Sequence, residues 1–173
     1  MLKRIGRVFK HRWLDASASR RAIPPDVARR LTERVAASER LHSGEIRICV
    51  EAGLPWSYLW RKASMQHITR QRALAMFGKL RVWDTANNNG VLIYLLLAER
   101  SIELVADRGL NDVVEPKTWQ MMVSRMSGAF RDGQFDGGLM QVIDSVTALL
   151  IQHFPPQVAA VNPNELPDAP ALN

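Results

Sequence analysis

The sequence contains a single cysteine, Cys49, among its 173 residues. One cysteine excludes an internal disulfide framework and a zinc site built from several cysteines. Such sparse cysteine use is consistent with a reducing compartment such as the cytosol. We expect Cys49 to be a structural thiol rather than a nucleophile, because no base lies beside it in sequence.

Long hydrophobic runs are equally scarce. The longest uninterrupted apolar run is Val91–Ala98, which has eight residues. A helix that spans a bilayer needs about 20 such residues, so the sequence predicts no membrane-spanning segment. Residues 1–10 carry the positive charge of a signal peptide but lack its apolar core and a small-residue cleavage site. We therefore expect this segment to stay on the mature chain and the protein to be cytoplasmic.

The signatures of several common enzyme classes are missing. The sequence has no Walker loop, no Gly-x-Gly-x-x-Gly or Gly-x-Ser-x-Gly motif, no Cys-x5-Arg phosphatase loop and no Asp-x-Asp pair. His42, His67 and His153 have no His-Glu-x-x-His or Cys-x-x-Cys companion, so we interpret them as surface or packing residues. Each absence excludes one enzyme class, and none excludes enzymes in general.

Positive charge is concentrated at one end of the chain. Residues 1–40 hold 11 basic and 4 acidic residues, whereas residues 41–173 hold 12 and 13. A near-neutral body argues against a nucleic-acid binder, which would carry its charge on the folded surface. The basic excess defines an N-terminal arm, residues 1–22. Its apolar residues fall near one helical face between the charges, namely Leu2, Ile5, Val8, Phe9 and Trp13.

That pairing of charge with apolar residues favours an anionic membrane surface as the arm's partner. Contact with nucleic-acid phosphates is the less favoured alternative. A solvated, disordered tail that binds nothing is the third interpretation. A peripheral location on the inner membrane follows from the first of these.

The remaining pattern alternates between helices and strands. Helices are predicted from about residue 25 to 41, over most of 56–82, from Pro116 to about Phe130, and from about Leu139 to Phe154. Residues 45–51 alternate as a half-buried strand, with Ile46, Ile48 and Val50 inward and Arg47, Cys49 and Glu51 outward. Residues 91–97 form a wholly apolar strand, and residues 101–106 pair with it through a tight turn.

This order predicts an α/β fold. The mixed β-sheet contains a strand–helix–strand crossover, which is normally parallel and right-handed, and a hairpin. Helices flank the sheet on both faces. We assign three parts: the amphipathic arm over residues 1–22, one folded domain over residues 23–156, and a mobile Pro/Asn-rich tail over residues 157–173.

Three loops should meet at one edge of this sheet: residues 42–44, 83–90 and 107–115. Clustered loops on a rigid sheet are a common place for a binding site. The candidate binding residues there are Trp83, Asn88, Asn89, Gly90, Arg108 and Gly109. Asp84, Asp107 and Asp112 are candidate oxygen ligands for Ca²⁺ or Mg²⁺. Alternatively, the Asn-rich loop is only an elaborate turn, and the carboxylates cap a helix or pair with Arg108.

Three segments together resemble the TPM domain family: Asn89-Gly90-Val91-Leu92-Ile93, Asp107-Arg108-Gly109-Leu110, and residues 130–139 with their Asp136-Gly137-Gly138-Leu139 end. The resemblance covers roughly residues 23–156 and is to short bacterial members. It implies a mixed sheet flanked by helices and a role in membrane-associated processes. It also implies divalent-cation binding at the sheet edge, as in some members, and acid phosphatase activity, as assigned to a plant member. Asn88 and Asn111 stand where many members have acidic residues.

Two functions follow from these observations. The first is a non-enzymatic binding module for membrane or envelope protein maintenance, with a protein partner of the LemA-like kind at its loop edge. The second is a metal-dependent phosphoesterase in which Asp84, Asp107 and Asp112 hold the cation that activates water. The sequence favours the first, because no residue is an evident nucleophile.

Overall fold

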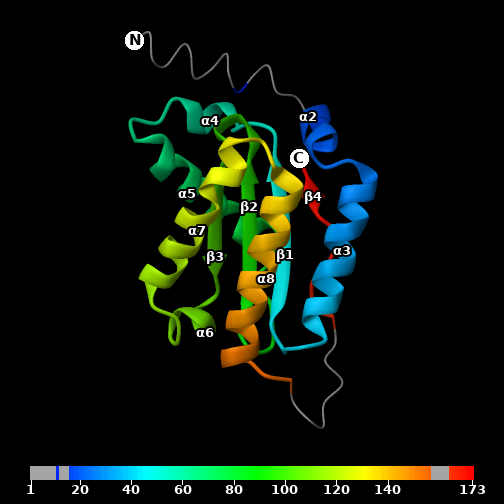
Figure 1. The fold of residues 1–173 in the computed structure, drawn as a ribbon. Helices are drawn as coiled ribbons and strands as arrows, with labels where there is room; N and C mark the ends of the chain where they lie inside the picture. The colour runs from blue at the N-terminus through cyan, green and yellow to red at the C-terminus, as the bar shows by residue number, and fades with distance from the viewer. Residues whose placement is uncertain (1–10, 12–15, 157–163) are drawn as a thin grey trace.

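A four-stranded sheet forms the centre of the protein (Figure 1). The computed structural model describes residue 11 and residues 16–156 and 164–173. The strands are β1 (Glu45–Glu51), β2 (Gly90–Leu96), β3 (Ser101–Ala106) and β4 (Ala171–Leu172), in the order β3-β2-β1-β4. β1 is parallel to β2 and to β4, whereas β2 and β3 are antiparallel. The predicted mixed sheet with a parallel crossover and a hairpin is therefore confirmed.

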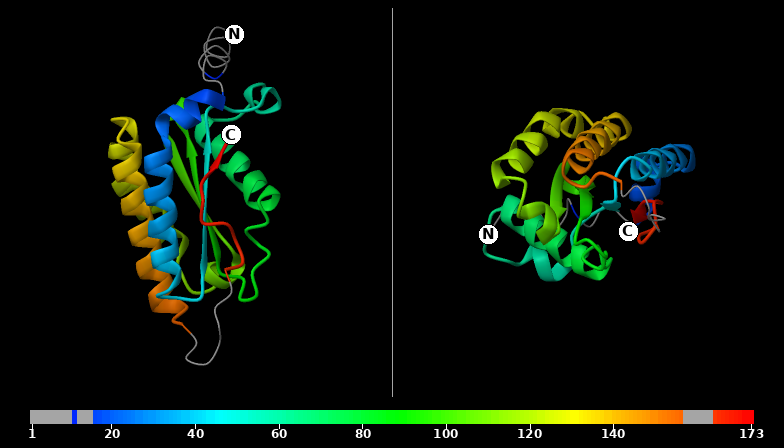
Figure 2. Two further views of the ribbon diagram at one scale, coloured as in Figure 1. Left: turned by 90° about the vertical axis from the view of Figure 1, so that its right-hand side faces the viewer. Right: turned by 90° about the horizontal axis from the view of Figure 1, so that it is seen from below.

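Helices cover both faces of the sheet, as expected (Figure 2). The elements are α2 (Ala16–Ala22), α3 (Pro25–Glu39), α4 (Trp56–Leu59), α5 (Met65–Lys79), η1 (Leu97–Glu99), α6 (Arg108–Asn111), α7 (Pro116–Arg131) and α8 (Phe135–His153). α3, α7 and α8 pack on one face and α5 on the other. In the part of the chain that the structure describes, no helix is both long and apolar enough to cross a membrane.

The two faces of the sheet enclose two separate hydrophobic clusters. Along β2, alternate side chains divide between them: Val91, Ile93 and Leu95 face the α3/α7/α8 layer, and Leu92, Tyr94 and Leu96 face α5. A strand covered on both faces needs a continuous apolar run, which is the pattern that predicted this strand.

β1 is also buried on both faces, which corrects the prediction of a half-buried strand. Every residue of β1 is buried, including Arg47 at 9% exposure and Glu51 at 4%. The Arg47 guanidinium donates to the carbonyls of Pro167 and Ala169, and Glu51 pairs with Arg72. Polar side chains tolerate burial when partners satisfy them. The alternation in β1 therefore reflects two different buried environments, one on each face of the sheet, and not a solvent-exposed face.

The end of the chain folds back along β1, in contrast to the predicted mobile tail. Residues 157–163 of that tail lie outside the described residues, but β4 extends the sheet beside β1. The Asn173 N–H donates to the Val50 carbonyl at 2.9 Å, and the Asn173 carbonyl accepts from the Ala52 N–H at 3.0 Å. The Ser19 hydroxyl of α2 donates to the same carbonyl at 2.6 Å. This segment therefore belongs to the folded body.

Part of the predicted arm is also ordered on the body. α2 packs against β1 and β4, and Ala18 and Ser19 are buried. His11 is 4% exposed: its Nδ1 accepts from the Leu54 N–H at 3.0 Å, and its Nε2 lies 2.9 Å from Glu99 Oε1. The amphipathic helix predicted over the first residues lies outside the described residues. The chain therefore joins the domain at His11 rather than at residue 23.

The long helix predicted over residues 56–82 is two helices. α4 ends at Leu59, and α5 begins after Ser64, whose hydroxyl accepts from the His67 N–H at 3.2 Å. A serine cap of this kind satisfies a backbone donor at the helix start. The break places the aromatic residues of α4 on a separate projection at the end of the sheet (Figure 1).

Candidate functional site

The three predicted loops do meet at one edge of the sheet. Glu45 at the start of β1 pairs with Gly90 at the start of β2, and Val91 pairs with Ala106 at the end of β3. The segments that precede β1 and β2 and follow β3 therefore share this edge, which is the lower end in Figure 1. We call it the loop edge: residues 41–45, 81–90 and 107–115.

Asn89 ties two of these loops together. Its side chain is 1% exposed, and its Nδ2 donates to the Ser43 carbonyl at 2.9 Å. Its backbone N–H donates to Thr85 Oγ1 at 3.1 Å. Asn89 therefore fixes the Asn-rich loop to the turn before β1. The structure thus gives Asn89 a structural role, and its predicted contact with a ligand stays a prediction.

Asn88 ties the Asn-rich loop to the third loop. Asn88 has φ +52°, which Asn tolerates better than most residues. Its backbone carbonyl accepts from the Gly109 N–H at 3.0 Å. Its Oδ1 accepts from Arg108 Nε at 3.0 Å and from Arg108 Nη2 at 2.8 Å. This pair of bonds fixes the orientation of an exposed guanidinium.

Gly90 and Gly109 are the points of closest backbone approach at the loop edge. A Cβ added at Gly90 would lie 2.0 Å from the Val82 carbonyl oxygen. At Gly109 it would lie 2.7 Å from the Asn88 carbonyl oxygen. Of the six predicted binding residues, these two glycines, Asn88 and Asn89 build the edge. Trp83, which is 51% exposed, and Arg108 face solvent on it.

The three candidate metal ligands differ in environment. Asp84 and Asp112 are exposed, whereas Asp107 is 8% exposed and caps α6, with its Oδ1 accepting from the Arg108 N–H at 2.8 Å. Asp107 Oδ2 is buried and has no hydrogen-bond partner among the described residues. Across those residues, no three His, Cys, Asp or Glu side chains are grouped to hold a metal ion. The three-aspartate cation site predicted from sequence is therefore not assembled, and cation binding by other donors stays a prediction.

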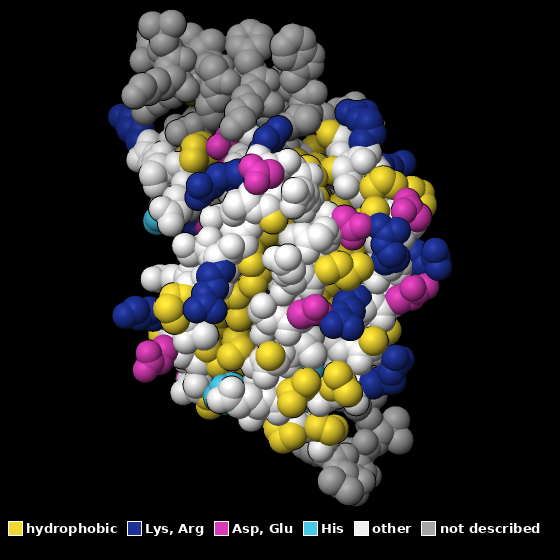
Figure 3. Space-filling model, in the orientation of Figure 1, with side chains coloured by type: hydrophobic (Ala, Val, Ile, Leu, Met, Phe, Trp, Pro, Cys, Tyr) yellow, Lys and Arg dark blue, Asp and Glu magenta, His cyan; other side chains and the backbone are white. Residues whose placement is uncertain are grey.

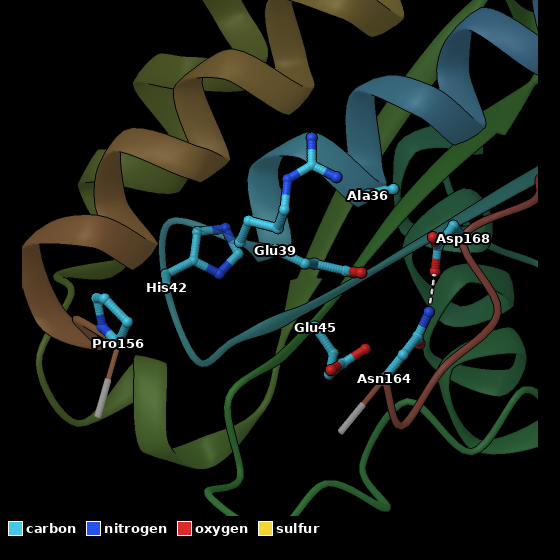
Figure 4. A pocket seen from close by; sticks show the side chains of 8 residues that line it. Ala36, Glu39, His42, Glu45, Pro156, Asn164 and Asp168 are labelled. Atoms are coloured by element: carbon cyan, nitrogen blue, oxygen red, sulfur yellow. Dashed lines mark hydrogen bonds between the residues drawn. The ribbon is translucent and has the colours of Figure 1, made fainter. Parts of the chain in front are cut away.

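An acidic cavity of about 490 Å³ opens beside the loop edge (Figure 4). Its lining comes from the end of α3, the start of β1 and the C-terminal segment: Ala36, Glu39, Arg40, His42, Glu45, Pro156, Asn164 and Asp168. Figure 4 shows the Glu39 and Glu45 side chains extending toward the segment that carries Asn164 and Asp168. Sequence reasoning missed this cavity, because two of its eight lining residues, Asn164 and Asp168, lie in the segment predicted to be mobile.

Burial alters the acidity of the groups in this cavity. Glu39 Oε1 accepts from the Ile46 N–H and Glu45 Oε2 from the Leu166 N–H, each at 3.1 Å. Burial, reinforced by neighbouring carboxylates, raises the pKa of Glu39 to about 8 and that of Glu45 to about 7. Burial lowers the pKa of His42 to about 4, so its imidazole is neutral. Near neutral pH the cavity therefore exchanges protons.

These raised pKa values predict a loss of stability in alkaline solution. A carboxyl whose folded pKa exceeds its unfolded value of 4.5 stabilises the fold below pH 4.5, and this contribution disappears as the pH rises through 7 to 8. We expect the free energy of unfolding to fall by about 3 kcal/mol between pH 6 and pH 9. Urea titrations at both pH values measure this fall.

Glu45→Gln should reduce that fall by about 1 kcal/mol, because glutamine keeps the bond to Leu166 without titrating. The exposed Glu33 provides the matched control, Glu33→Gln, whose profile should follow the wild-type curve. Identical pH profiles for all three proteins would disprove the assignment. His42 acts in the opposite direction at the lower edge of this window, because its lowered pKa destabilises the fold as the pH falls below about 6.5.

The single thiol is not activated. Cys49 is fully buried, and burial raises its pKa to about 12. A thiol of this kind carries almost no thiolate at neutral pH, which removes its nucleophilicity. Its Sγ accepts from Asn173 Nδ2 at 3.6 Å. The prediction that Cys49 is structural therefore agrees with its surroundings, although the strand face that carries it is covered rather than outward.

Comparison with known protein families shows to which family this fold belongs. The family model described as the TPM domain matches residues 19–149. The chain belongs to the TPM domain family. The match begins within α2 and ends within α8, so β4 and the C-terminal wall of the acidic cavity lie beyond the matched part of this TPM domain.

Two solved structures share the fold. The NMR structure of the BA42 protein from the psychrophilic bacterium Bizionia argentinensis is 25% identical, with a TM-score of 0.71. The match covers 86% of this chain and 94% of that one. The N-terminal domain of a protein from P. gingivalis is 20% identical, with a TM-score of 0.50, over 72% of this chain and 76% of that chain. No curated protein matches this TPM domain.

Proposed function

We propose that this TPM domain is a non-enzymatic binding module that engages a protein partner through its loop edge. The observation that carries the proposal is the preoriented Arg108 guanidinium on the edge that also exposes Trp83. Trp and Arg are the residue types that dominate binding energy at protein interfaces. Asn88 and Asn89 hold the loops before a partner arrives, which lowers the entropic cost of binding.

The chemistry of Arg108 indicates what the partner presents. A guanidinium has five N–H donors, of which Asn88 engages two. The outer donors suit a carboxylate, which binds arginine in a fork geometry. The partner therefore offers an acidic group beside an apolar one. Guided by the family resemblance, we propose that this partner belongs to a membrane or envelope maintenance system on the cytoplasmic side, with a LemA-like protein as our candidate.

Site-specific photo-crosslinking in cells tests this function. A benzophenone amino acid in place of Trp83 should give one discrete adduct, and Arg108→Ala in the same protein should weaken that adduct at least tenfold. Leu74 on α5 is exposed to a similar extent, 49% against 51%, and provides the control position. Equal adducts from positions 83 and 74, or an adduct insensitive to Arg108, would contradict the proposal.

A divalent cation at the loop edge is a separate part of the proposal. Asp107 is the carboxylate best placed to hold it, because its buried Oδ2 has no partner within the described chain. Ca²⁺ prefers several oxygen ligands, so further oxygen donors, such as backbone carbonyls or water, would have to complete the site. The phosphoesterase alternative needs a cation held jointly by Asp84, Asp107 and Asp112, and no observation among the described residues favours it.

Amide NMR during Ca²⁺ and Mg²⁺ titration tests the cation. We expect shifts confined to residues 83–90 and 107–112, and we expect Asp107→Asn to abolish them. Asp84→Asn should leave most of the shifts, because the Asp84 carboxylate is exposed to solvent, whereas that of Asp107 is buried in the loop edge. Unchanged spectra at millimolar cation would refute the cation site and leave the protein-binding proposal intact.

A further inference from the structure

The end of the molecule opposite the loop edge carries an exposed aromatic projection. Trp56 and Trp60 of the α4 segment are 48% and 58% exposed, and their rings stack at 6.2 Å between centroids with an interplanar angle of 17°. Large aromatic side chains are rarely this exposed on a small protein, because burying them would remove their apolar surface from contact with water.

Basic side chains surround this projection. Arg61 and Lys62 follow Trp60 directly and are exposed. The Arg61 guanidinium lies 3.9 Å from the centroid of the Tyr58 ring. α2 adds the exposed Arg20 and Arg21 at the same end of the molecule (Figure 1). Residues 52–64 and 16–25 contain no acidic residue, so these segments bring only positive charge.

The basic arm joins the body beside this projection. The His11 Nδ1 accepts from the N–H of Leu54, which lies two residues before Trp56. The carbonyl oxygen of His11 lies 2.6 Å from the Cβ that a side chain at Gly53 would have. His11 is therefore anchored at the α4 end, and the ten residues before it in the sequence include four basic residues and no acidic one.

The charges elsewhere on the surface are arranged differently. Over α3 and α8, basic side chains are matched by acidic partners, as Figure 3 shows. Arg30 contacts Asp136 and Arg34 contacts Asp144, both at 2.5 Å. At the loop edge and its cavity, carboxylates predominate. At the α4 end, by contrast, two exposed tryptophans lie in a segment that contains basic residues and no acidic one.

We propose that the α4 end, formed by Trp56, Trp60, Arg61 and Lys62, is a docking surface for an anionic lipid bilayer. Indole rings prefer the interface between headgroups and acyl chains, where one part of the ring is apolar and another is hydrated. Lysine and arginine beside them attract anionic headgroups. A protein partner would need carboxylates arranged for these cations, whereas an anionic membrane presents negative charge at any orientation.

This docking surface does not depend on the partner proposed for the loop edge. β1 has seven residues, so the two ends of the sheet are about 20 Å apart. A protein docked on a bilayer through the α4 end would present its loop edge to the aqueous side. Membrane docking and partner binding can therefore succeed or fail separately in experiments.

Vesicle flotation with the full chain tests the docking surface. We expect binding to vesicles of phosphatidylglycerol and phosphatidylcholine, and little binding to phosphatidylcholine alone. Trp56→Ala/Trp60→Ala should lower the partition coefficient about tenfold or more, and Arg61→Gln/Lys62→Gln should lower it about fivefold for each charge removed. Trp83→Ala, which removes an exposed tryptophan from the loop edge, is the matched control and should bind like the wild type.

A second readout keeps the test independent of variant folding. Brominated acyl chains should quench the tryptophan fluorescence of the wild-type protein, and this quenching should decrease in the Trp56→Ala/Trp60→Ala variant. Three results would overturn the proposal: equal binding of that variant and the wild type, binding lost only when residues 1–10 are deleted, or equal binding to neutral and anionic vesicles. If the Trp56→Ala/Trp60→Ala variant bound vesicles like the wild type but lost a protein adduct in cells, the surface would belong to a protein partner instead.

Discussion

Replacement of Arg72 by methionine is expected to destabilise the protein by about 3–5 kcal/mol. Arg72 Nη2 lies 2.5 Å from Glu51 Oε1, and its Nε lies 2.8 Å from Glu51 Oε2. Glu51 Oε2 also accepts from the Tyr94 hydroxyl at 2.7 Å. Glu51 is only 4% exposed, so its carboxylate would lose its counter-charge without gaining water. Urea unfolding followed by circular dichroism measures the loss.

Two further variants separate this effect from lost packing. Arg72→Met/Glu51→Gln should recover much of the stability, because a neutral glutamine costs less to bury and still accepts from Tyr94. Arg29→Met removes half of an exposed helical ion pair with Glu33 and should change stability by less than about 0.5 kcal/mol. A similar loss in Arg72→Met and Arg29→Met would mean that the buried pair is not a stabilising unit.

Gly90→Ala is expected to cost more than about 3 kcal/mol or to prevent folding. The added Cβ would lie 2.0 Å from the Val82 carbonyl oxygen and 3.0 Å from Val82 Cγ1. Neither chain can move freely, because the Val82 N–H donates to the Phe77 carbonyl and the Gly90 carbonyl accepts from the Asp107 N–H. The substitution therefore forces apart the two ends of the Asn-rich loop, residues 81–90.

The controls for Gly90→Ala lie in helices. Gly78 in α5 and Gly128 in α7 have no atom within 4 Å of the position that a Cβ would take. Alanine there should stabilise the protein by about 0.5–1 kcal/mol, because glycine is a poor helix former. Thermal unfolding of the three variants gives the comparison. A Gly90→Ala protein as stable as either control would show that the strand and loop approach each other less closely than described.

Sequence patterns predicted the part of the fold that apolar periodicity controls. The bounds of β1 and β3 agree with the expected ranges, and that of β2 is shifted by one residue. The rule that a strand–helix–strand crossover joins parallel strands predicts that the three loops share one edge of the sheet, as they do. Periodicity works here because alternate residues of β2 fill two different cores. Gly90 and Gly109 were also among the predicted binding residues, although their role in the structure is close backbone packing.

What the sequence could not predict depends on pairing across long separations. β4 has two residues and follows a proline-containing segment, and nothing in Ala171–Leu172 identifies β1 as its partner. The acidic cavity needs Asp168 beside Glu39, which are 129 positions apart in a chain without a periodic signal linking them. The candidate aspartates share an edge as predicted, but their side-chain directions depend on capping. Asp107 turns inward to the start of α6.

Together, the proposals assign a separate binding role to each end of the sheet. In these proposals the α4 end docks on an anionic bilayer, and the loop edge, at the other end of the sheet, binds a protein partner. This arrangement explains why the chain combines a locally basic end with a near-neutral body. It also keeps the carboxylates of the loop edge away from the membrane, whose negative charge would otherwise repel them and oppose docking.

Environment-sensitive fluorescence at the two ends tests this account most directly. Ser57 in α4 and Asn87 in the loop edge are both exposed, and Cys49 is buried, so a cysteine introduced at either position can be labelled selectively. On anionic vesicles, a nitrobenzoxadiazole label at position 57 should shift to the blue and gain intensity, and the same label at position 87 should not change. A blue shift at position 87, or none at position 57 when the protein is bound, would contradict the account.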